Sequence, residues 1–250
     1  MKKVIILLLL LSQQLFSQGK DELFEKGNEH YKLANYSEAI SSYQEIEALG
    51  FISSELYYNL GNCYYKLNQV APAIYNYEKA LLINPLNEDA QRNLVFAKRL
   101  TIDAIEELPK TIFQKLDTSL VKKLSYNEWA TVAVVFSVLG AILFLLFYFS
   151  YTPSKKRLFF VTSIISFLVL FITSFFTVKE YSYVNTTVEA IIFSKNTDVK
   201  NAPTFNSEKV FTLHEGTKIE LLESLDEWNK IRIANGSEGW IKNADLRSLN

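Results

Sequence analysis

The 250-residue sequence predicts a multidomain membrane protein in which an all-α repeat array, a two-helix transmembrane hairpin and an all-β barrel follow one another. Three observations lead to this fold class. The N-terminal third repeats itself at an offset of 34 residues, two uncharged apolar stretches come next, and the C-terminal segment consists of short β-branched and aromatic runs. These patterns are typical of helical repeats, membrane-spanning helices and small β-barrels, respectively.

The repeat is carried by small and aromatic residues. Gly27 recurs as Gly61 and Tyr43 as Tyr77, and Pro85 stops the second copy because proline cannot donate to a helical ladder. The period and residue types resemble the tetratricopeptide repeat, a pair of antiparallel helices that binds other proteins. Two repeats make a short array, so we expect the isolated domain to be only marginally stable. The expected ranges are 20–52 and 54–87 for the repeats and 87–105 for a capping helix, within a domain of residues 20–107.

In such arrays the first helix of each pair lines a groove. The candidate groove residues are spaced by four and then three positions, so they share one helical face. Asparagine amides bind a guest's backbone, arginine pairs with carboxylates, and tyrosine adds amphipathic contact area. The alternative is that the asparagines only belong to the repeat's own consensus. The expected partner-binding groove consists of Phe24, Asn28, Tyr31, Tyr58, Asn62, Tyr65 and Arg92.

The N-terminus has the pattern of a secretory signal peptide. Two lysines precede eight aliphatic residues, Val4–Leu11, and small or polar residues come after them near Ser17. The alternative, a signal anchor, is disfavoured because so short an apolar run does not cross about 30 Å of hydrocarbon. We therefore expect a signal peptide over residues 1–18 and export of the mature N-terminal domain.

Two uncharged stretches, 130–151 and 158–178, are each long enough to cross a bilayer as a helix. The loop between them, 152–157, carries three basic residues and no acidic one, which suits the cytoplasm, but Lys110, Lys115, Lys122 and Lys123 precede the first span, so the count of basic residues is close to a tie. The signal peptide decides the orientation. An exported N-terminus followed by two spans returns the chain to the outside. We expect a two-span protein of the cytoplasmic (inner) membrane of a bacterium, with both soluble modules in the periplasm.

The segment before the first span, residues 108–128, is amphipathic. Apolar residues recur at every fourth position, with lysines interspersed: Ile112, Leu116, Leu120 and Leu124. This spacing fits a basic helix that lies along the membrane surface. It fits equally a helix packed against the repeats, and both interpretations stay open.

The C-terminal segment, residues 187–250, has β character. Asn235-Gly236 separates two strand-like runs, which is a strong hairpin signal. Leu213-His-Glu-Gly-Thr217 and the Gly-x-x-Gly-Trp that ends at Trp240 resemble the bacterial SH3-like domain, whose relatives bind cell-wall peptides or act as spacers. The resemblance implies a small all-β barrel.

Two tryptophans of this module, Trp228 and Trp240, are candidates for a ligand surface of the barrel. The alternative is that one or both lie in the core. The Asn-x-Arg that usually stands near the start of the domain is Asp198-x-Lys200 here. No ligand role is therefore carried over from that element.

Composition argues against catalysis and against nucleic-acid binding. The net charge of -1 does not provide the basic surface that nucleic acids require. A single cysteine, Cys63, excludes a disulfide framework, and the two histidines, His30 and His214, fall in different modules. The sequence contains no nucleotide-binding, zinc-protease or serine-hydrolase motif with its companions. We expect no enzyme activity, no cofactor, no metal site and no nucleic-acid partner.

The order of signal peptide, two repeats, membrane hairpin and SH3-like barrel resembles the BatE-type family of the Bat aerotolerance operons. The resemblance implies a non-enzymatic scaffold of an envelope complex linked to oxidative stress or aerotolerance. It also implies protein partners in the same membrane complex, von Willebrand A-domain proteins among them. The alternative is a cell-wall anchor whose barrel binds peptidoglycan peptides.

Overall fold

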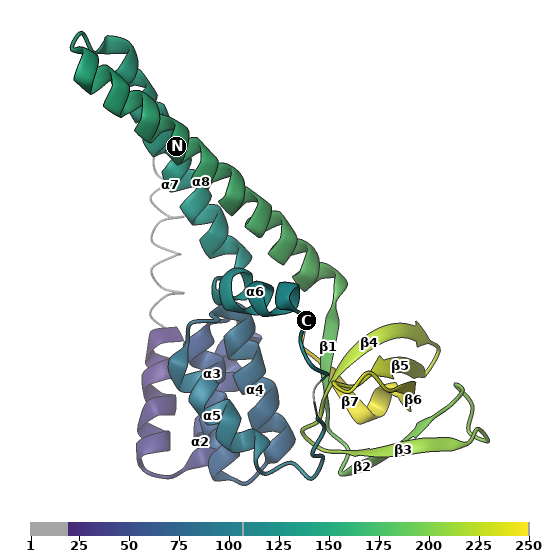
Figure 1. Ribbon diagram of the computed structural model, residues 1–250. Coiled ribbons are helices and arrows are strands. Elements are labelled where there is room, and N and C mark those ends of the chain that lie inside the picture. The colour runs from purple at the N-terminus through teal and green to yellow at the C-terminus, as the bar shows by residue number, and fades with distance from the viewer. Residues whose placement is uncertain (1–19, 107, 250) are drawn as a thin grey trace, which may run out of the picture. The chain divides into compact units, whose positions relative to one another are not determined.

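A computed structural model describes residues 20–106 and 108–249 (Figure 1). The expected signal peptide, residues 1–18, lies outside the described residues. The described chain belongs to two compact units. The first unit contains the repeat helices and the C-terminal strands, and the second contains Asn84–Leu86 and Pro109–Val188. The helical repeats, the two long apolar helices and the antiparallel C-terminal sheet confirm the predicted fold class.

The repeat helices have regular caps and turns. Ser53 Oγ accepts a hydrogen bond from Leu56 N, and Asn87 Oδ1 accepts one from Ala90 N, so both side chains satisfy an N-terminal amide. Ala34 and Asn68 have positive φ angles of 60° and 57° and occupy the same place in the two copies. The described helices of the repeats and their cap are 20–32, α2 (Tyr36–Ala48), α3 (Ser54–Lys66), α4 (Val70–Ile83) and α5 (Glu88–Lys98).

Each repeat is closed by a glycine that lies against a tyrosine ring. A Cβ atom on Gly27 would stand 2.5 Å from Tyr43 Cε1, and one on Gly61 would stand 2.6 Å from Tyr77 Cδ1. Both distances are far below van der Waals contact, so any larger residue would push the two helices apart. The same contact between a glycine and a tyrosine ring therefore joins the two helices of each repeat.

The capping helix is shorter than expected. The sequence predicts a helix over 87–105, whereas α5 ends at Lys98. Residues 101–106 are not helical. Asp103 accepts hydrogen bonds from the backbone amide of His214 and the hydroxyl of Thr217, at 2.7 and 2.5 Å. A helix through this segment would not bring the carboxylate to these partners.

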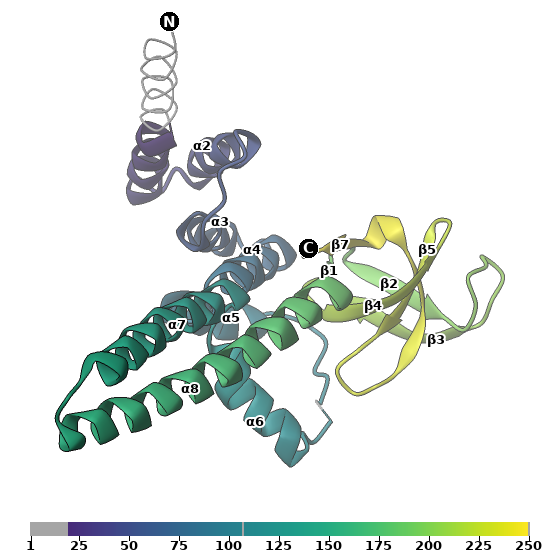
Figure 2. The same ribbon diagram turned by 90° about the horizontal axis from the view of Figure 1, so that it is seen from above.

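The C-terminal strands form one seven-stranded antiparallel sheet in the order β3-β2-β6-β5-β4-β1-β7 (Figure 2). The predicted hairpin at Asn235-Gly236 is confirmed: it joins β5 to β6, and Gly236 has a φ of +87°. The core contains Ile192, Val199 and Ile231. The strands are β1 (Val188–Ile192), β2 (Asn196–Lys200), β3 (Lys209–His214), β4 (Lys218–Leu225), β5 (Trp228–Arg232), β6 (Glu238–Lys242) and β7 (Leu246–Ser248).

The barrel and the repeats share a hydrophobic cluster within the first unit. Ile191 and Leu249 of the barrel belong to the same buried cluster as Ile74 of α4. The rings of Tyr75 and Phe193 meet edge to face, 5.6 Å apart. The barrel therefore supplies apolar cover that two repeats and a short cap do not provide by themselves.

A buried carboxylate lies in the same contact. Glu78 of α4 is only 7% exposed. Lys218 Nζ donates a hydrogen bond to Glu78 Oε2 at 2.9 Å and also pairs with Glu189 at 2.7 Å. Lys98 Nζ lies 2.8 Å from Glu78 Oε1, an ion pair without hydrogen-bond geometry. Removing the hydrogen-bonded cation would leave a carboxylate with little access to water.

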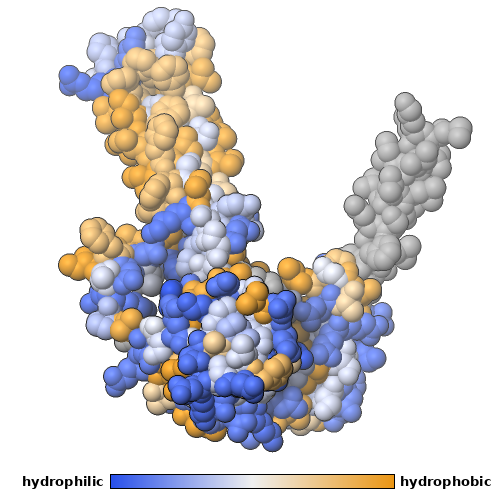
Figure 3. Space-filling view, turned by 90° about the vertical axis from the view of Figure 1, so that its right-hand side faces the viewer, coloured by the Kyte–Doolittle hydropathy of each residue, from blue (hydrophilic) through white to orange (hydrophobic). Residues whose placement is uncertain are grey.

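The second unit is a helical hairpin preceded by short helices. Its two long helices are both apolar enough and long enough to cross a membrane, and their surface is mostly hydrophobic (Figure 3). Ser166 Oγ donates to Phe136 O at 2.9 Å and Ser163 Oγ to Gly140 O at 3.2 Å, so hydroxyls join the helices. Compared with the expected spans, the first helix begins earlier and the second is longer at both ends. The elements are α6 (Ile112–Leu120), η1 (Val121–Lys123), α7 (Tyr126–Phe149) and α8 (Pro153–Thr186).

Replacing Lys218 by methionine should destabilise the first unit by roughly 3 kcal/mol, because the buried Glu78 carboxylate loses its hydrogen-bonded cation. The thermal midpoint of the detergent-solubilised full chain measures this loss. Lys209→Met is the control, since it removes an exposed lysine paired with Asp198 and should cost less than about 1 kcal/mol. Equal midpoints for the two variants would contradict the structural importance of the buried pair.

Acid should weaken the contact between the repeat domain and the C-terminal strands, because two carboxylates, Glu78 and Asp103, take part in it. Burial opposes ionisation of Glu78 and Asp103, but the cations beside Glu78, and the hydrogen bonds from Thr217 and His214 to Asp103, prevail and lower both carboxyl pKa values. The stabilisation is therefore complete above the ordinary pKa values of 4.5 and 3.8 and is lost as pH falls through the lowered ones. The thermal midpoint should drop in this acid range. Asp103→Asn should show a shallower drop, and a wild-type midpoint independent of pH there would refute the assignment.

Candidate functional site

The two predicted groove asparagines form the same hydrogen-bonded cluster in each repeat. Asn28 Oδ1 accepts from the Tyr43 hydroxyl at 2.7 Å and from Asn59 Nδ2 at 3.2 Å. One period further along, Asn62 Oδ1 accepts from the Tyr77 hydroxyl at 2.7 Å and from Asn93 Nδ2 at 2.8 Å. The two carbonyl oxygens are therefore fully occupied by protein donors.

This arrangement fixes how the amides are presented. With Oδ1 held by two donors, the NH₂ group of each asparagine must face the other way. Among the described residues, the Nδ2 atoms of Asn28 and Asn62 donate no hydrogen bond. Both side chains are only partly buried. Each repeat thus presents one oriented N–H donor pair, which suits a backbone carbonyl of a guest chain.

Sequence reasoning missed Asn59 and Asn93, which hold these amides in place. Asn59 directly follows Tyr58 and Asn93 directly follows Arg92, so both point away from the expected face, and their role requires contacts between successive helices. They are nevertheless 34 positions apart, so the repeat period itself contained the signal. Burial raises the pKa values of Tyr43 and Tyr77, so the two hydroxyls stay protonated and keep donating.

The remaining groove candidates are placed differently from one another. Phe24 packs on Tyr43 and Tyr58 on Tyr77, with ring centroids 5.7 and 6.3 Å apart. The other predicted residues do not share one arrangement: Tyr31 stacks edge to face on Tyr36, Tyr65 is partly buried, and Arg92 is exposed and pairs with Glu88 and Asp89 of its own helix. On α5 it is Asn93, rather than Arg92, that contacts Asn62.

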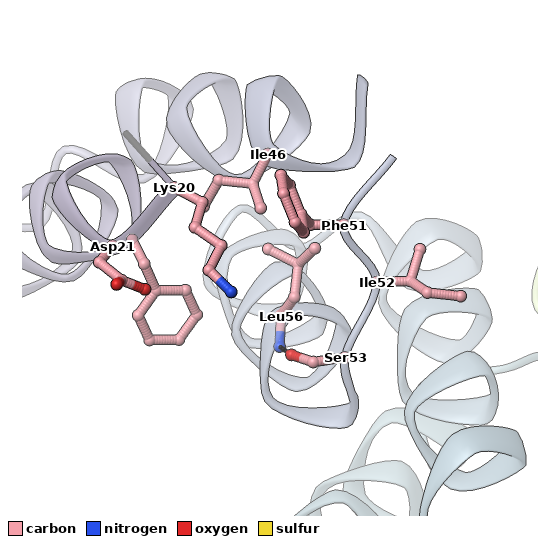
Figure 4. A pocket seen from close by; sticks show the side chains of 8 residues that line it. Lys20, Asp21, Ile46, Phe51, Ile52, Ser53 and Leu56 are labelled. Carbon is pink, nitrogen blue, oxygen red and sulfur yellow. Dashed lines mark hydrogen bonds between the residues drawn. The ribbon is translucent and has the colours of Figure 1, made fainter. Parts of the chain in front are cut away.

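A small apolar pocket of about 180 Å³ lies at the start of the first repeat (Figure 4). Phe24 is one of its lining residues, and Lys20 Nζ stands 4.9 Å from the ring centroid of Phe51 at its edge. Sequence reasoning did not find this pocket, because its wall is the loop between α2 and α3. The other lining residues are Asp21, Ile46, Ile52, Ser53 and Leu56.

The two tryptophans of the barrel lie on one face of the β5–β6 ladder. Trp228 is opposite Lys242 and Trp240 is opposite Lys230, whereas the core residue Ile231 belongs to the other face. Trp228 is nevertheless only 5% exposed, because the ring of Phe205 stands over it at 5.6 Å. Trp240 is partly exposed. The face carries aromatic rings and lysines together.

Beside this face is an open cleft of about 370 Å³. Lys242 Nζ lies 4.5 Å from the Phe205 ring centroid and Lys200 Nζ 5.9 Å from that of Trp228. Asp245, which also lines the cleft, accepts hydrogen bonds from Thr197 and Ser194. Cations beside aromatic rings suit a ligand with a carboxylate and an apolar part.

Comparison with known families agrees with the separation of the chain into helical repeats and a C-terminal β domain. The family model of the tetratricopeptide repeat matches residues 54–87, and that of the bacterial SH3 domain matches residues 195–247. No curated protein matches the chain in sequence. The chain therefore contains a tetratricopeptide repeat and a bacterial SH3 domain together with two long apolar helices, and both matched domains are of non-catalytic types. Within the described residues, no three histidine, cysteine or acidic side chains gather as metal ligands.

Asn62→Ala should destabilise the repeats by about 1–3 kcal/mol, because the buried Tyr77 hydroxyl loses its acceptor. Asn62→Asp should cost much less, since a carboxylate oxygen accepts from Tyr77 and Asn93 in the same place. The thermal midpoints of the two variants measure the difference between losing the acceptor and keeping it. If alanine and aspartate proved equally stable, the hydrogen-bonded cluster would not support the fold.

Proposed function

We propose that this chain is a non-enzymatic, membrane-anchored scaffold whose repeat groove holds an extended segment of a partner protein. The observation that carries the proposal is the pair of amide donors at Asn28 and Asn62, oriented by buried tyrosines and spaced by one repeat. Tetratricopeptide repeats and SH3 domains are interaction modules, which supports a binding role. Following the resemblance to BatE-type proteins, the expected partners are membrane proteins of the same envelope complex, including von Willebrand A-domain proteins.

A periplasmic location of both soluble modules accompanies this proposal. The repeats and the barrel belong to one compact unit, so they must lie on the same side of any membrane. Two helices long enough to span separate them in sequence, and an even number of spans returns the chain to its starting side. The basic loop between the helices favours the cytoplasm for the connection.

Asn28→Asp combined with Asn62→Asp should abolish capture of the partner. The change keeps the acceptors that Tyr43 and Tyr77 need but replaces each N–H donor by a carboxylate oxygen, which repels a guest carbonyl. Recovery of copurifying membrane proteins, quantified after mild detergent extraction, should fall at least about tenfold.

Asn235→Asp is the matched control. It makes the same chemical change in the β5–β6 turn, where the side-chain oxygen accepts from Ser237 N in either form. Partners recovered equally by the groove variant and the control would refute the groove. Point changes are used because deleting residues 187–250 would also remove Lys218 and the apolar cover of the repeats.

The barrel cleft supports a second candidate function, the binding of a cell-wall peptide. Phe205→Ala with Lys242→Gln should then abolish cosedimentation of the purified chain with peptidoglycan. The groove variant should leave that cosedimentation unchanged. Loss of membrane partners in the cleft variant, with retention in the groove variant, would favour the anchor over the scaffold.

Topology is tested with reporter fusions. Fusions after Glu106 and at the C-terminus should report export, and a fusion at Ser154 should report the cytoplasm. The reason is that an even number of spans separates the two soluble modules. A cytoplasmic signal at the C-terminus would contradict the proposed arrangement.

A further inference from the structure

The short helix α6 exposes a continuous apolar face. Ile112 is 76% and Phe113 83% exposed, and Leu116 and Leu120 are also exposed large apolar side chains. These four positions fall within about a quarter to a third of the helical circumference. Thr111 and Gln114 form a capping box, so the helix is well defined at its start although it buries no residue. A defined helix with an uncovered apolar face requires an apolar environment outside the protein's own core.

Side-chain contacts join this helix to the membrane hairpin within the second unit. Asp117 of α6 forms an ion pair with Lys179 of α8. In the adjoining turn η1, Lys122 Nζ stands 3.5 Å from the ring centroid of Tyr183. Trp129 Nε1 of α7 donates to Val121 O at 2.9 Å. The helix is therefore held beside one end of the hairpin.

The aromatic residues at this end indicate where the membrane surface lies. Trp129 packs on Phe176 with centroids 5.0 Å apart, and Tyr126 packs on Tyr181 at 5.6 Å. Tryptophan and tyrosine gather at the boundary between hydrocarbon and headgroups. The 34 residues of α8 extend about 51 Å, well beyond the roughly 30 Å of hydrocarbon, so its end leaves the membrane near this belt. The contacts with Lys179 and Tyr183 place α6 at that level.

The charges beside the apolar face complement a lipid surface. Lys115 and Lys123 are exposed and Lys122 is partly exposed, while the one acidic residue of α6, Asp117, is paired with Lys179. The apolar side chains thus suit the acyl boundary of a bilayer, and the lysines suit its anionic headgroups.

We infer that α6 lies in the membrane surface, with Ile112, Phe113 and Leu116 inserted at the acyl boundary and the lysines among anionic headgroups. The helix is a second membrane attachment that fixes the depth and tilt of the hairpin. The inference rests on the proposed anchoring of the chain by α7 and α8. Of the two interpretations of the sequence, it selects the membrane surface rather than packing on the repeats.

Single cysteines carrying an environment-sensitive fluorophore test the inference in the full chain, reconstituted into vesicles of phosphatidylcholine and phosphatidylglycerol. Phe113→Cys and Leu116→Cys report the apolar face, Thr118→Cys the polar face, and Leu145→Cys the outer surface of α7, where Leu145 is 54% exposed. Cys63 does not interfere, because it is fully buried and burial raises its pKa to about 12. Unmodified protein serves as the labelling blank.

The labels at positions 113 and 116 should be quenched by spin-labelled lipid and protected severalfold from an aqueous quencher compared with position 118. Aqueous quenching at 113 equal to that at 118, with position 145 protected, would overturn the inference and leave membrane anchoring intact. Protection at 113 without quenching by lipid would show protein cover instead, and would also overturn it. A water-exposed label at 145 would refute the anchoring itself.

Discussion

The hydrogen-bonded ion pair between Glu78 and Lys218 is the constraint on which the first unit depends. A carboxylate this deeply buried is costly unless cations accompany it. Lys98 of the repeat domain supplies one, and Lys218, the one that donates a hydrogen bond, comes from a module 140 residues further along. The pair therefore ties the formation of the repeat array to that of the barrel. Ile191 and Leu249 add apolar contacts between the same two domains, in a buried cluster with Ile74. Two repeats, too short to bury a continuous core alone, are completed by their own C-terminal domain.

In the groove, each of two asparagines combines a role in the fold with a group that a partner could use. Asn28 and Asn62 are required by the repeat, because they accept from buried tyrosines, and they are suited to a guest, because their NH₂ groups are turned outward. The structural role and the proposed binding role would thus be carried by opposite ends of one amide. A consensus residue and a ligand-binding residue need not be alternatives, since the core fixes the orientation that the proposed binding would use.

The proposed membrane anchoring and the assembly of the first unit would constrain each other. The apolar helices lie in the sequence between two domains that pack together, so a hairpin that crosses a membrane, as proposed, would have to return the chain to the side it left. The ion pair and aromatic contacts that hold α6 beside the hairpin would limit how far the hairpin shifts in depth within the bilayer. The hydroxyls of Ser163 and Ser166 join α8 to backbone carbonyls of α7.

The sequence by itself determined the features that are periodic or local. The 34-residue period predicts the helical pairs, uncharged length predicts the two long helices, and Asn235-Gly236 predicts the β5–β6 hairpin, because each depends on neighbouring residues alone. The end of α5 at Lys98, the strands β2 and β3, and the covering of Trp228 by Phe205 were decided by the tertiary structure. So were the partners of Glu78 and Asp103. A hydrogen bond between residues more than 100 positions apart leaves no periodic trace in the chain, since its geometry exists only once both domains have folded and met.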